Sequence, residues 1–166
     1  MENKIILGLD NGNAYTKSSE GFSCQSGFTK SDVEPITKQN LLIYQGIYYS
    51  IGNNRSSVQL DKTQTQDAFI ISLAAIADAI NKAGIEQKAD VFLGVGLPVV
   101  HYGKMKARFR EYFLRSNINF NYLGIDYTIN IKNCRVYRQG YAAVINIYKE
   151  YKDIALANVI DIGGYT

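Results

Sequence analysis

Two apolar segments of this chain each run into an aspartate that is followed, two positions later, by a glycine. These turns lie at residues 10–12 (Asp-Asn-Gly) and 161–163 (Asp-Ile-Gly). A short apolar run that ends in a turn is typical of a buried strand. A carboxylate at the end of a buried strand is costly unless a cation compensates its charge. The pair of turns therefore constrains both the fold and the chemistry of the chain.

The first turn has the composition of a phosphate-binding loop. Asp10 can hold a magnesium ion, directly or through its waters. Gly12 lets successive backbone N–H groups face a phosphate without a Cβ in the way, and Asn13 adds a side-chain donor. Lys17, on the returning strand, can supply a positive charge. Asp-Asn-Gly is also a common hairpin turn that holds no ligand, so this turn alone leaves both interpretations open.

The second turn repeats the pattern, since an apolar strand again delivers an aspartate, Asp161, into a glycine turn. Each turn alone is compatible with an ordinary strand ending, but together they would form a two-sided clamp for a polyphosphate and its metal. Gln139 lies between them at an expected strand-to-helix junction. It can orient a water for in-line attack on a terminal phosphate, although without the clamp it would be an ordinary surface residue.

Hydrophobic periodicity predicts a mixed α/β sheet flanked by helices. Three antiparallel strands open the chain, and a small strand-bearing insertion at residues 30–62 follows, with one alternating segment at 41–51. Thr63 and Gln66 have capping-box spacing, and Gly84 is expected to end that helix. The expected strands are 4–9, 14–18, 22–28, 90–96, 117–122, 127–131, 135–137 and 158–162, and the expected helices are 63–84, 102–115 and 140–151.

Composition excludes several classes of function. A net charge of +3 is too small to argue for direct nucleic-acid binding. Cys24 and Cys134 lack metal-ligand spacing, and we expect both thiols to be reduced. No segment approaches the ~20 apolar residues of a membrane span. We therefore expect a cytoplasmic protein without membrane contact.

Residues 10–17, 139–143 and 161–166 together resemble the two phosphate motifs and the connecting segment of the actin, sugar-kinase and heat-shock-chaperone ATPase superfamily. The Gly-Leu-Pro segment at 96–98 is similar to that of bacterial ParM-type plasmid-segregation proteins and archaeal actin-like proteins. The resemblance implies an actin-type fold whose first domain, residues 1–166, is ribonuclease-H-like with 30–62 as an inserted subdomain. A second domain with the adenosine pocket is expected beyond this chain, so we expect the chain alone to bind nucleotide weakly or undetectably and to be inactive.

The resemblance also implies the roles of individual residues, with ATP and Mg²⁺ as cofactors. Asp10 and Asp161 would organise the magnesium, Gln139 would position the attacking water, and Asp161 would also act in catalysis. The implied phosphate-binding residues are Asp10, Asn11, Gly12, Asn13, Lys17, Gly163, Gly164 and Tyr165. Asn13 replaces the serine or threonine of many relatives, which leaves the hydrolysis rate open. Gln139 replaces the glutamate of many ParM relatives and would orient the water rather than deprotonate it.

The resemblance implies an ATPase that polymerises into filaments for plasmid segregation, through self-association and an adaptor protein bound to the plasmid DNA. One alternative is a small-molecule kinase of the same superfamily, which would require a catalytic aspartate in the first domain. No buried aspartate stands out at residues 90–130, and Asp126 lies in an expected turn, which favours the filament. A second alternative is a binding module without catalysis. The basic residues between Lys104 and Arg115 are a solvated helix face or a filament contact.

Overall fold

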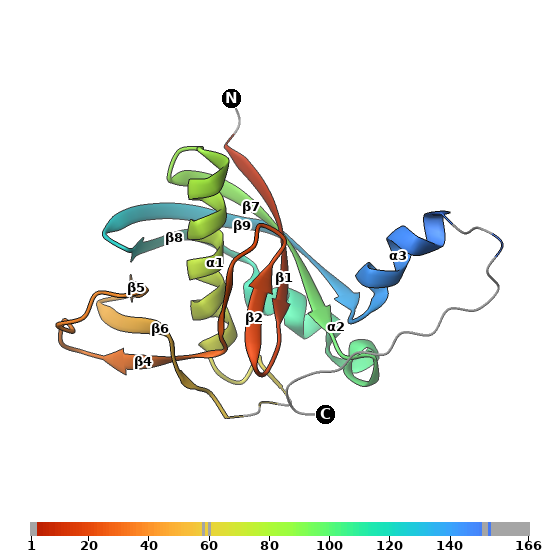
Figure 1. Cartoon of the computed structure of the whole chain (residues 1–166), viewed down its shortest axis with the longest axis horizontal. Coiled ribbons are helices and arrows are strands. Elements are labelled where there is room, and N and C mark those ends of the chain that lie inside the picture. Colours follow the sequence, from red (N-terminus) through yellow and green to blue (C-terminus); the bar gives the residue numbers. More distant parts are fainter. Residues whose placement is uncertain (1–2, 58, 60, 151–152, 154–166) are drawn as a thin grey trace.

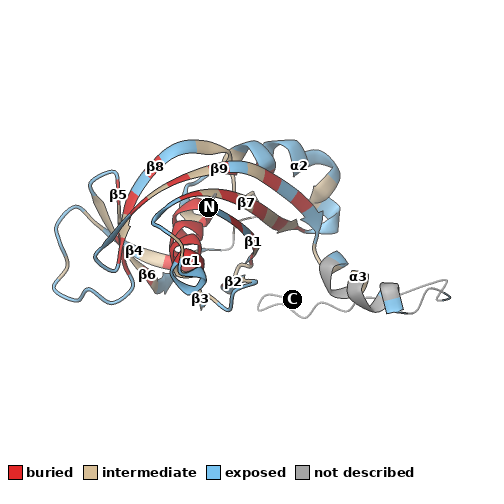
Figure 2. Cartoon of the chain, turned by 90° about the horizontal axis from the view of Figure 1, so that it is seen from above, coloured by how far each residue is buried: buried red, intermediate tan, exposed pale blue. Residues whose placement is uncertain are grey.

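A computed structural model describes residues 3–57, 59, 61–150 and 153 of the chain. These residues form a mixed sheet of nine strands in the order β3-β2-β1-β7-β9-β8-β5-β6-β4. The sheet curves around one long helix, α1 (Asp67–Ala83), whose buried side chains and those of the strands form the core (Figures 1 and 2). The predicted fold class, a mixed α/β sheet with flanking helices, is confirmed.

The chain opens with the expected antiparallel meander. β1 (Lys4–Asn11) pairs with β2 (Tyr15–Ser18), and β2 pairs with β3 (Ser23–Gln25). Buried and exposed residues alternate along β1, so that one face of the strand enters the core and the other does not. This alternation decides which side of the sheet each residue of the following turn occupies.

The third strand of the meander, predicted at 22–28, is broken. It ends at Gln25, and the chain starts a separate strand, β4 (Gly27–Ser31), which pairs with β6 at the far edge of the sheet. A Cβ at Gly27 would collide with the carbonyl oxygen of Asn54. The two backbones therefore approach as closely as they do because residue 27 has no side chain.

The centre of the sheet is parallel. β7 (Lys88–Leu97) lies parallel to both β1 and β9 (Ile125–Arg138), and β8 (Arg115–Tyr122) forms the predicted hairpin with β9. The separate strand expected at 135–137 is the last part of β9, which is 14 residues long.

The alternating segment at 41–51 forms strands, as expected, but it contains a chain reversal and is a hairpin. β5 (Leu41–Tyr44) and β6 (Ile47–Arg55) are joined by Gln45 and Gly46, which have φ angles of 52° and 76°. Two consecutive positive φ angles are those of a type I′ turn, which matches the twist of a hairpin. β5 also pairs with β8, so the strands of the expected insertion continue the main sheet.

Helix α1 begins at Asp67, four residues later than predicted. The capping box is absent, because Gln66 occupies the N-cap position without a side-chain cap bond. Thr63 instead donates through both its backbone N–H and its hydroxyl to Asp61, at 3.0 and 2.6 Å. The predicted end is confirmed, since Gly84 adopts the left-handed conformation at φ 62°.

The other two helices are α2 (Val99–Phe113) and α3 (Tyr141–Glu150), close to the predicted 102–115 and 140–151. The strand expected at 158–162 lies outside the described residues. Within the described ranges, no helix has the length and apolar character that crossing a bilayer requires.

The start of α1 is held by residues that follow it in the sequence. The backbone N–H of Phe69 donates to the Tyr112 hydroxyl at 2.9 Å, which satisfies one of the free N–H groups of a helix start. The Arg115 guanidinium lies 3.7 Å from the centre of the Phe69 ring. Arg115 therefore packs on α1 and is not part of a solvated basic helix face.

Candidate functional site

Asp10 lies on the exposed face of the sheet, whereas the sequence suggested a buried carboxylate. Leu7, Leu9 and Asn11 are buried at 0, 3 and 4% exposure on one side of β1. Asp10 is exposed, because the period-two geometry of a strand turns it away from Leu9 and Asn11. The unfavourable burial invoked from the sequence is absent, and the Asp10 carboxylate is open to a cation from solvent.

Lys17 shares this exposed face. It is the cross-strand partner of Asp10 in the β1–β2 ladder, and it is likewise exposed. Residues directly opposite each other in an antiparallel pair have Cβ atoms about 4.5–5.5 Å apart. An anion bound at the end of this hairpin would thus meet a cation and a potential metal-binding carboxylate side by side.

Gln139 reaches the same end of the sheet. Its backbone N–H donates to the Leu97 carbonyl at 2.8 Å, and its side chain folds over Gly96, where an added Cβ would lie 3.1 Å from the Gln139 Cγ. Leu9 and Val95 are partners in the parallel ladder. Gly96 therefore lies level with Asp10 and on the same face. The structure places Gln139 and Asp10 at the same end of the central strands, and their roles stay predictions.

The backbone of the turn has an asymmetric hydrogen-bonding pattern. The carbonyl oxygens of Gly12, Asn13 and Ala14 accept hydrogen bonds from the Ser26 hydroxyl (2.7 Å), the Arg55 Nε (3.4 Å) and the Ser26 N–H (2.9 Å), respectively. The N–H groups of the same three residues have no acceptor in the described part of the chain. Successive free N–H groups form a concave site for an anion.

Gly12 is required by the close approach of the returning strand. A Cβ at this position would lie 2.6 Å from the carbonyl oxygen of Tyr15. Only a residue without a side chain fits this turn.

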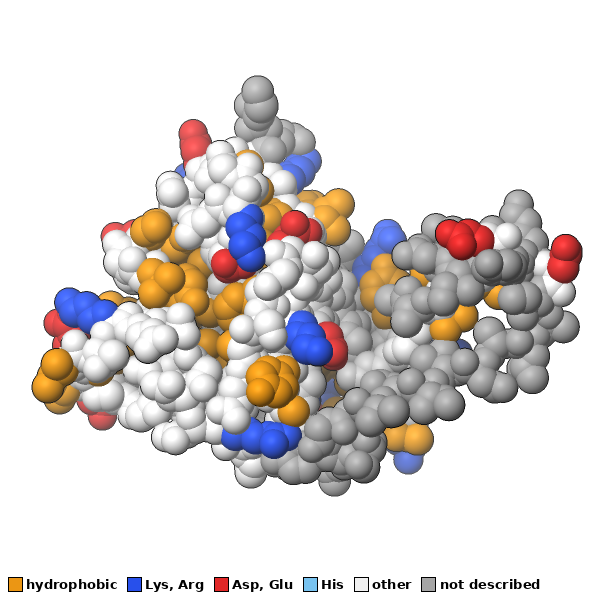
Figure 3. Space-filling view, viewed as in Figure 1, with side chains coloured by type: hydrophobic (Ala, Val, Ile, Leu, Met, Phe, Trp, Pro, Cys, Tyr) orange, Lys and Arg blue, Asp and Glu red, His pale blue; other side chains and the backbone are white. Residues whose placement is uncertain are grey.

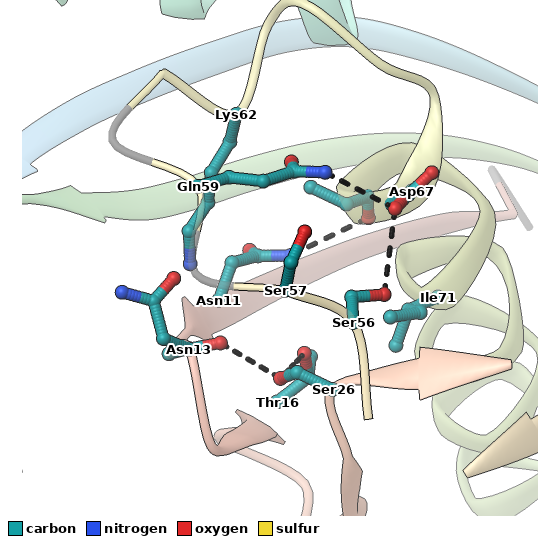
Figure 4. A pocket seen from close by; sticks show the side chains of 12 residues that line it. Asn11, Asn13, Thr16, Ser26, Ser56, Ser57, Gln59, Lys62, Asp67 and Ile71 are labelled. Atoms are coloured by element: carbon teal, nitrogen blue, oxygen red, sulfur yellow. Dashed lines mark hydrogen bonds between the residues drawn. The ribbon is translucent and has the colours of Figure 1, made fainter. Parts of the chain in front are cut away.

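The Asn11 side chain anchors the turn to α1. Its Nδ2 donates to the Ser72 hydroxyl at 3.2 Å and to the Ala68 carbonyl at 3.4 Å. Figure 4 shows it pointing away from the turn and toward the start of α1. If Asn11 contributes to phosphate binding, as the sequence predicts, it does so through its backbone.

Two residues that the sequence did not indicate lie beside the turn. Ser26, which holds two carbonyls of the turn, is 7% exposed and pairs with the Thr16 hydroxyl at 2.9 Å. Lys62 lines a pocket behind the turn together with Gly12 and Asn13. Burial lowers the pKa of Lys62 from 10.5 to about 8, while attraction to Asp10 partly opposes this shift. No local motif marks either residue, because both are brought to the turn by tertiary contacts.

The second half of the expected site lies outside the described residues: Asp161, Gly163, Gly164 and Tyr165. Within the described ranges, no three metal-binding side chains come together. Magnesium is commonly held by one or two carboxylates, substrate phosphates and water. A single exposed carboxylate beside free N–H groups is therefore compatible with a magnesium ion that arrives with a polyphosphate.

Comparisons with known proteins agree with this fold. The family model of the N-terminal domain of actin-like proteins matches residues 8–141. None of the curated proteins matches the sequence.

Three similar solved structures illustrate the range of the likeness. The chain matches the apo ParM protein of pSK41 at 19% identity and TM-score 0.71, covering 88% of this chain and 53% of that one. The filament structure of AlfA from the B. subtilis plasmid pLS32 matches at 16% identity and TM-score 0.64, with 84% and 57% covered. The archaeal actin homolog Ta0583, in complex with ADP, matches at 20% identity and TM-score 0.64, with 89% and 47% covered.

The chain thus spans about half the length of the solved structures that it matches. At these identities the structures establish the fold, and the family model covers most of the chain. The chain belongs to the family of actin-like proteins, whose N-terminal domain its residues 8–141 match.

Proposed function

We propose that this chain is the phosphate-holding domain of an actin-like ATPase that polymerises into filaments. The observation that carries the proposal is the turn at residues 12–14, whose carbonyls are bonded inward while its N–H groups lack acceptors in the described part of the chain. Asp10 and Lys17 flank this turn as cross-strand partners. A turn that served only to reverse the chain would not need this combination of free donors, a cation and a carboxylate.

We propose a separate role for each residue at this end of the sheet. The N–H groups of Gly12 and Asn13 donate to the β- and γ-phosphate oxygens, and Lys17 adds a positive charge. Asp10 holds the magnesium, whose charge would stabilise negative charge on the phosphates. Gln139 orients the attacking water. Asp161 and the glycine turn that follows it are proposed to complete the clamp, with Asp161 as a second magnesium ligand.

The filament part of the proposal rests on the relatives. AlfA is similar in fold and is described as a filament, and other similar structures include ParM proteins. We propose self-association of the whole protein, with an adaptor bound to plasmid DNA making the contact with the cargo. On the face shown in Figure 3, acidic and basic side chains are scattered and do not form one basic patch. The net charge of +3 is compatible with an adaptor that makes the DNA contact.

The domain arrangement is also a proposal. Because the chain spans about half the length of its structural relatives, we propose that residues 1–166 form the first domain of the protein. Residues 30–62 would be its small subdomain, and a second domain would supply the adenosine pocket. ATP is then the proposed nucleotide, and ADP-bound Ta0583 is a relative with the same fold.

The kinase alternative finds little support in the two aspartates of residues 90–130. Asp90 accepts a hydrogen bond from Asn130 Nδ2 at 2.9 Å and lies near the start of β7, while Gly96 and the site lie near its end. Asp126 accepts from Asn121 Nδ2 at 2.7 Å within the β8–β9 hairpin. Neither carboxylate lies at the end of the central strands that carries Asp10 and Gln139. A general base for a substrate hydroxyl is therefore not offered by these two residues.

The experiment is ATP-dependent light scattering of the full-length protein, with electron microscopy of the products. We expect filaments that require ATP and magnesium, and their loss in Asp10→Ala. Asp32→Ala changes an exposed carboxylate outside the site and is expected to polymerise normally. Sugar- or acid-dependent release of ADP without scattering would establish a kinase instead, and the absence of both activities would establish a binding module.

A further inference from the structure

Lys62 lies near the turn at residues 12–14 on the side of α1, whereas Lys17 lies on the exposed face of the sheet. It lies in the segment between β6 and α1 and lines a pocket of about 30 Å³ together with Gly12 and Asn13. Figure 4 shows its side chain extending from that segment toward the turn, between Gln59 and Asn13. The chain thus presents two lysines to one hairpin end.

The ammonium group of Lys62 lacks a partner in the described part of the chain. Among the described residues, no acceptor lies within hydrogen-bond distance of the ammonium and no carboxylate within ion-pair distance, although the side chain is half-buried. The charged groups around it are Asp10 from β1 and Asp67 at the start of α1. Asp67 is occupied by Ser56 and Gln59, which donate to its Oδ2 at 3.4 and 3.2 Å. A half-buried cation without a partner is unfavourable, which suggests that its partner is a ligand.

The pocket itself is too small to be the ligand site. A space of about 30 Å³ holds water. The pocket is also lined by Asn11, which is 4% exposed and whose Oδ1 has no partner among the described residues. An anion that Lys62 can reach must therefore lie at the mouth of the pocket, where Gly12 and Asn13 present their free N–H groups.

We propose that Lys62 is a second cation of the phosphate site, and that its ammonium contacts the polyphosphate from the α1 side while Lys17 faces it from the other. This inference rests on the proposed function and adds a residue to the same site. It also means that a residue of the segment between β6 and α1 contacts any polyphosphate bound at the turn. A bound anion stabilises the protonated form of Lys62, so binding takes up a proton when the pH is near 8.

The test uses this chain with Mg²⁺ and inorganic tripolyphosphate, a probe that has no base or ribose and so needs no adenosine pocket. The titration of the Lys62 side chain is followed by NMR of its ¹³Cε atom, together with the backbone amides of Gly12 and Asn13. We expect the pKa of Lys62, about 8 without the probe, to rise at saturation. Lys62→Met should weaken tripolyphosphate binding about tenfold, because a hydrogen bond to a charged group is lost.

Lys104→Met is the matched control, because Lys104 is an exposed lysine on α2 outside the site. It should bind tripolyphosphate as the unaltered chain does. Lys62→Met should remain folded, which denaturant unfolding verifies. If the amides of the turn respond while the Lys62 titration and the Lys62→Met affinity stay unchanged, the inference about Lys62 is wrong and the proposed function stands. If neither the amides nor Lys62 respond at any probe concentration, in this chain or in the full-length protein, both are wrong.

Discussion

Asp10 on β1 and Lys17 on β2 are directly opposite each other in the sheet, and both side chains lie on its exposed face. An exposed pair of opposite charges stabilises a fold by little, with a median of about 0–1 kcal/mol. The placement of this pair beside three N–H groups that lack acceptors in the described residues therefore points to a ligand instead of a structural contact. Substitutions at this site should separate binding from stability.

Asp10→Asn should abolish the contribution of magnesium to tripolyphosphate binding while leaving the fold intact. The carboxylate is exposed, so we expect the free energy of unfolding to change by no more than about 0.5 kcal/mol. Calorimetric titrations with and without Mg²⁺ measure the first effect, and urea unfolding measures the second. Asp32→Asn, at an exposed position outside the site, should retain the magnesium effect. An Asp10→Asn chain with unaltered magnesium dependence would contradict the assignment.

Gly12→Ala and Gly103→Ala should have opposite effects on stability. The added Cβ at residue 12 would meet the Tyr15 carbonyl at 2.6 Å, and we expect a loss of about 1–3 kcal/mol in unfolding free energy. At residue 103, inside α2, an added Cβ would meet no described atom within 4 Å beyond the adjoining helix backbone, and the gain should be about 0.5–1 kcal/mol. Denaturant unfolding of the two variants distinguishes them. Equal effects would contradict the close approach of the Tyr15 carbonyl to residue 12.

Asn11→Ala and Asn13→Ala should separate the anchoring of the turn to α1 from the binding of tripolyphosphate. Asn11 is buried and donates to Ser72 and Ala68, so its loss should lower the unfolding free energy by about 1–3 kcal/mol. The Asn13 side chain has no protein partner in the described part of the chain. Its removal should weaken tripolyphosphate binding and leave the melting temperature nearly unchanged. A stable Asn11→Ala chain, or an unstable Asn13→Ala chain, would reverse these roles.

Lys62→Met should stabilise the chain most at neutral pH. Burial lowers the pKa of Lys62 from 10.5 to about 8, so below pH 8 the folded state carries the full unfavourable energy of a buried charge. Between pH 8 and 10.5 the unfolded state binds more protons, and the stability of the unaltered chain rises with pH through this group. The advantage of the variant should therefore shrink over that window. Urea midpoints of both chains across pH 7–11 test this, and a constant difference would contradict it.

Elements whose signal is local could be predicted from the sequence. Residues 10–12 marked the first hairpin, and Gly84 marked the end of α1. The strand β7 followed from the apolar run at 90–96, and the first part of β9 followed from the alternation at 127–131. Each depends on the residues of one short segment, and a single sequence contains that information.

Features set by tertiary contacts could not be predicted in this way. The alternation at 41–51 does not show where a strand reverses, because Gln45 keeps the parity of the strand while its positive φ closes a turn. Thr63 and Gln66 have capping-box spacing, yet the hydroxyl of Thr63 is taken by Asp61. Arg115 was expected on a basic helix face, either solvated or in a filament contact, but the ring of Phe69 lies beneath its guanidinium.

The candidate site shows the same division. Asp10, Gly12 and Lys17 lie within one hairpin and could be named from its sequence. Ser26 and Lys62 come from other segments and depend on how β3, β4 and α1 pack around the turn. The opposite faces of Asp10 and Asn11 follow from strand geometry once the pairing of β1 is known.

The most direct test of the account is amide hydrogen exchange at Gly12, Asn13 and Ala14, measured by NMR with and without tripolyphosphate and Mg²⁺. These N–H groups lack acceptors in the described part of the chain, and they should exchange rapidly alone and slowly when the probe is bound. Saturable protection of these amides, lost in Asp10→Asn, is the predicted result. Unchanged exchange at all three amides under saturating probe would contradict the phosphate-binding role of this turn.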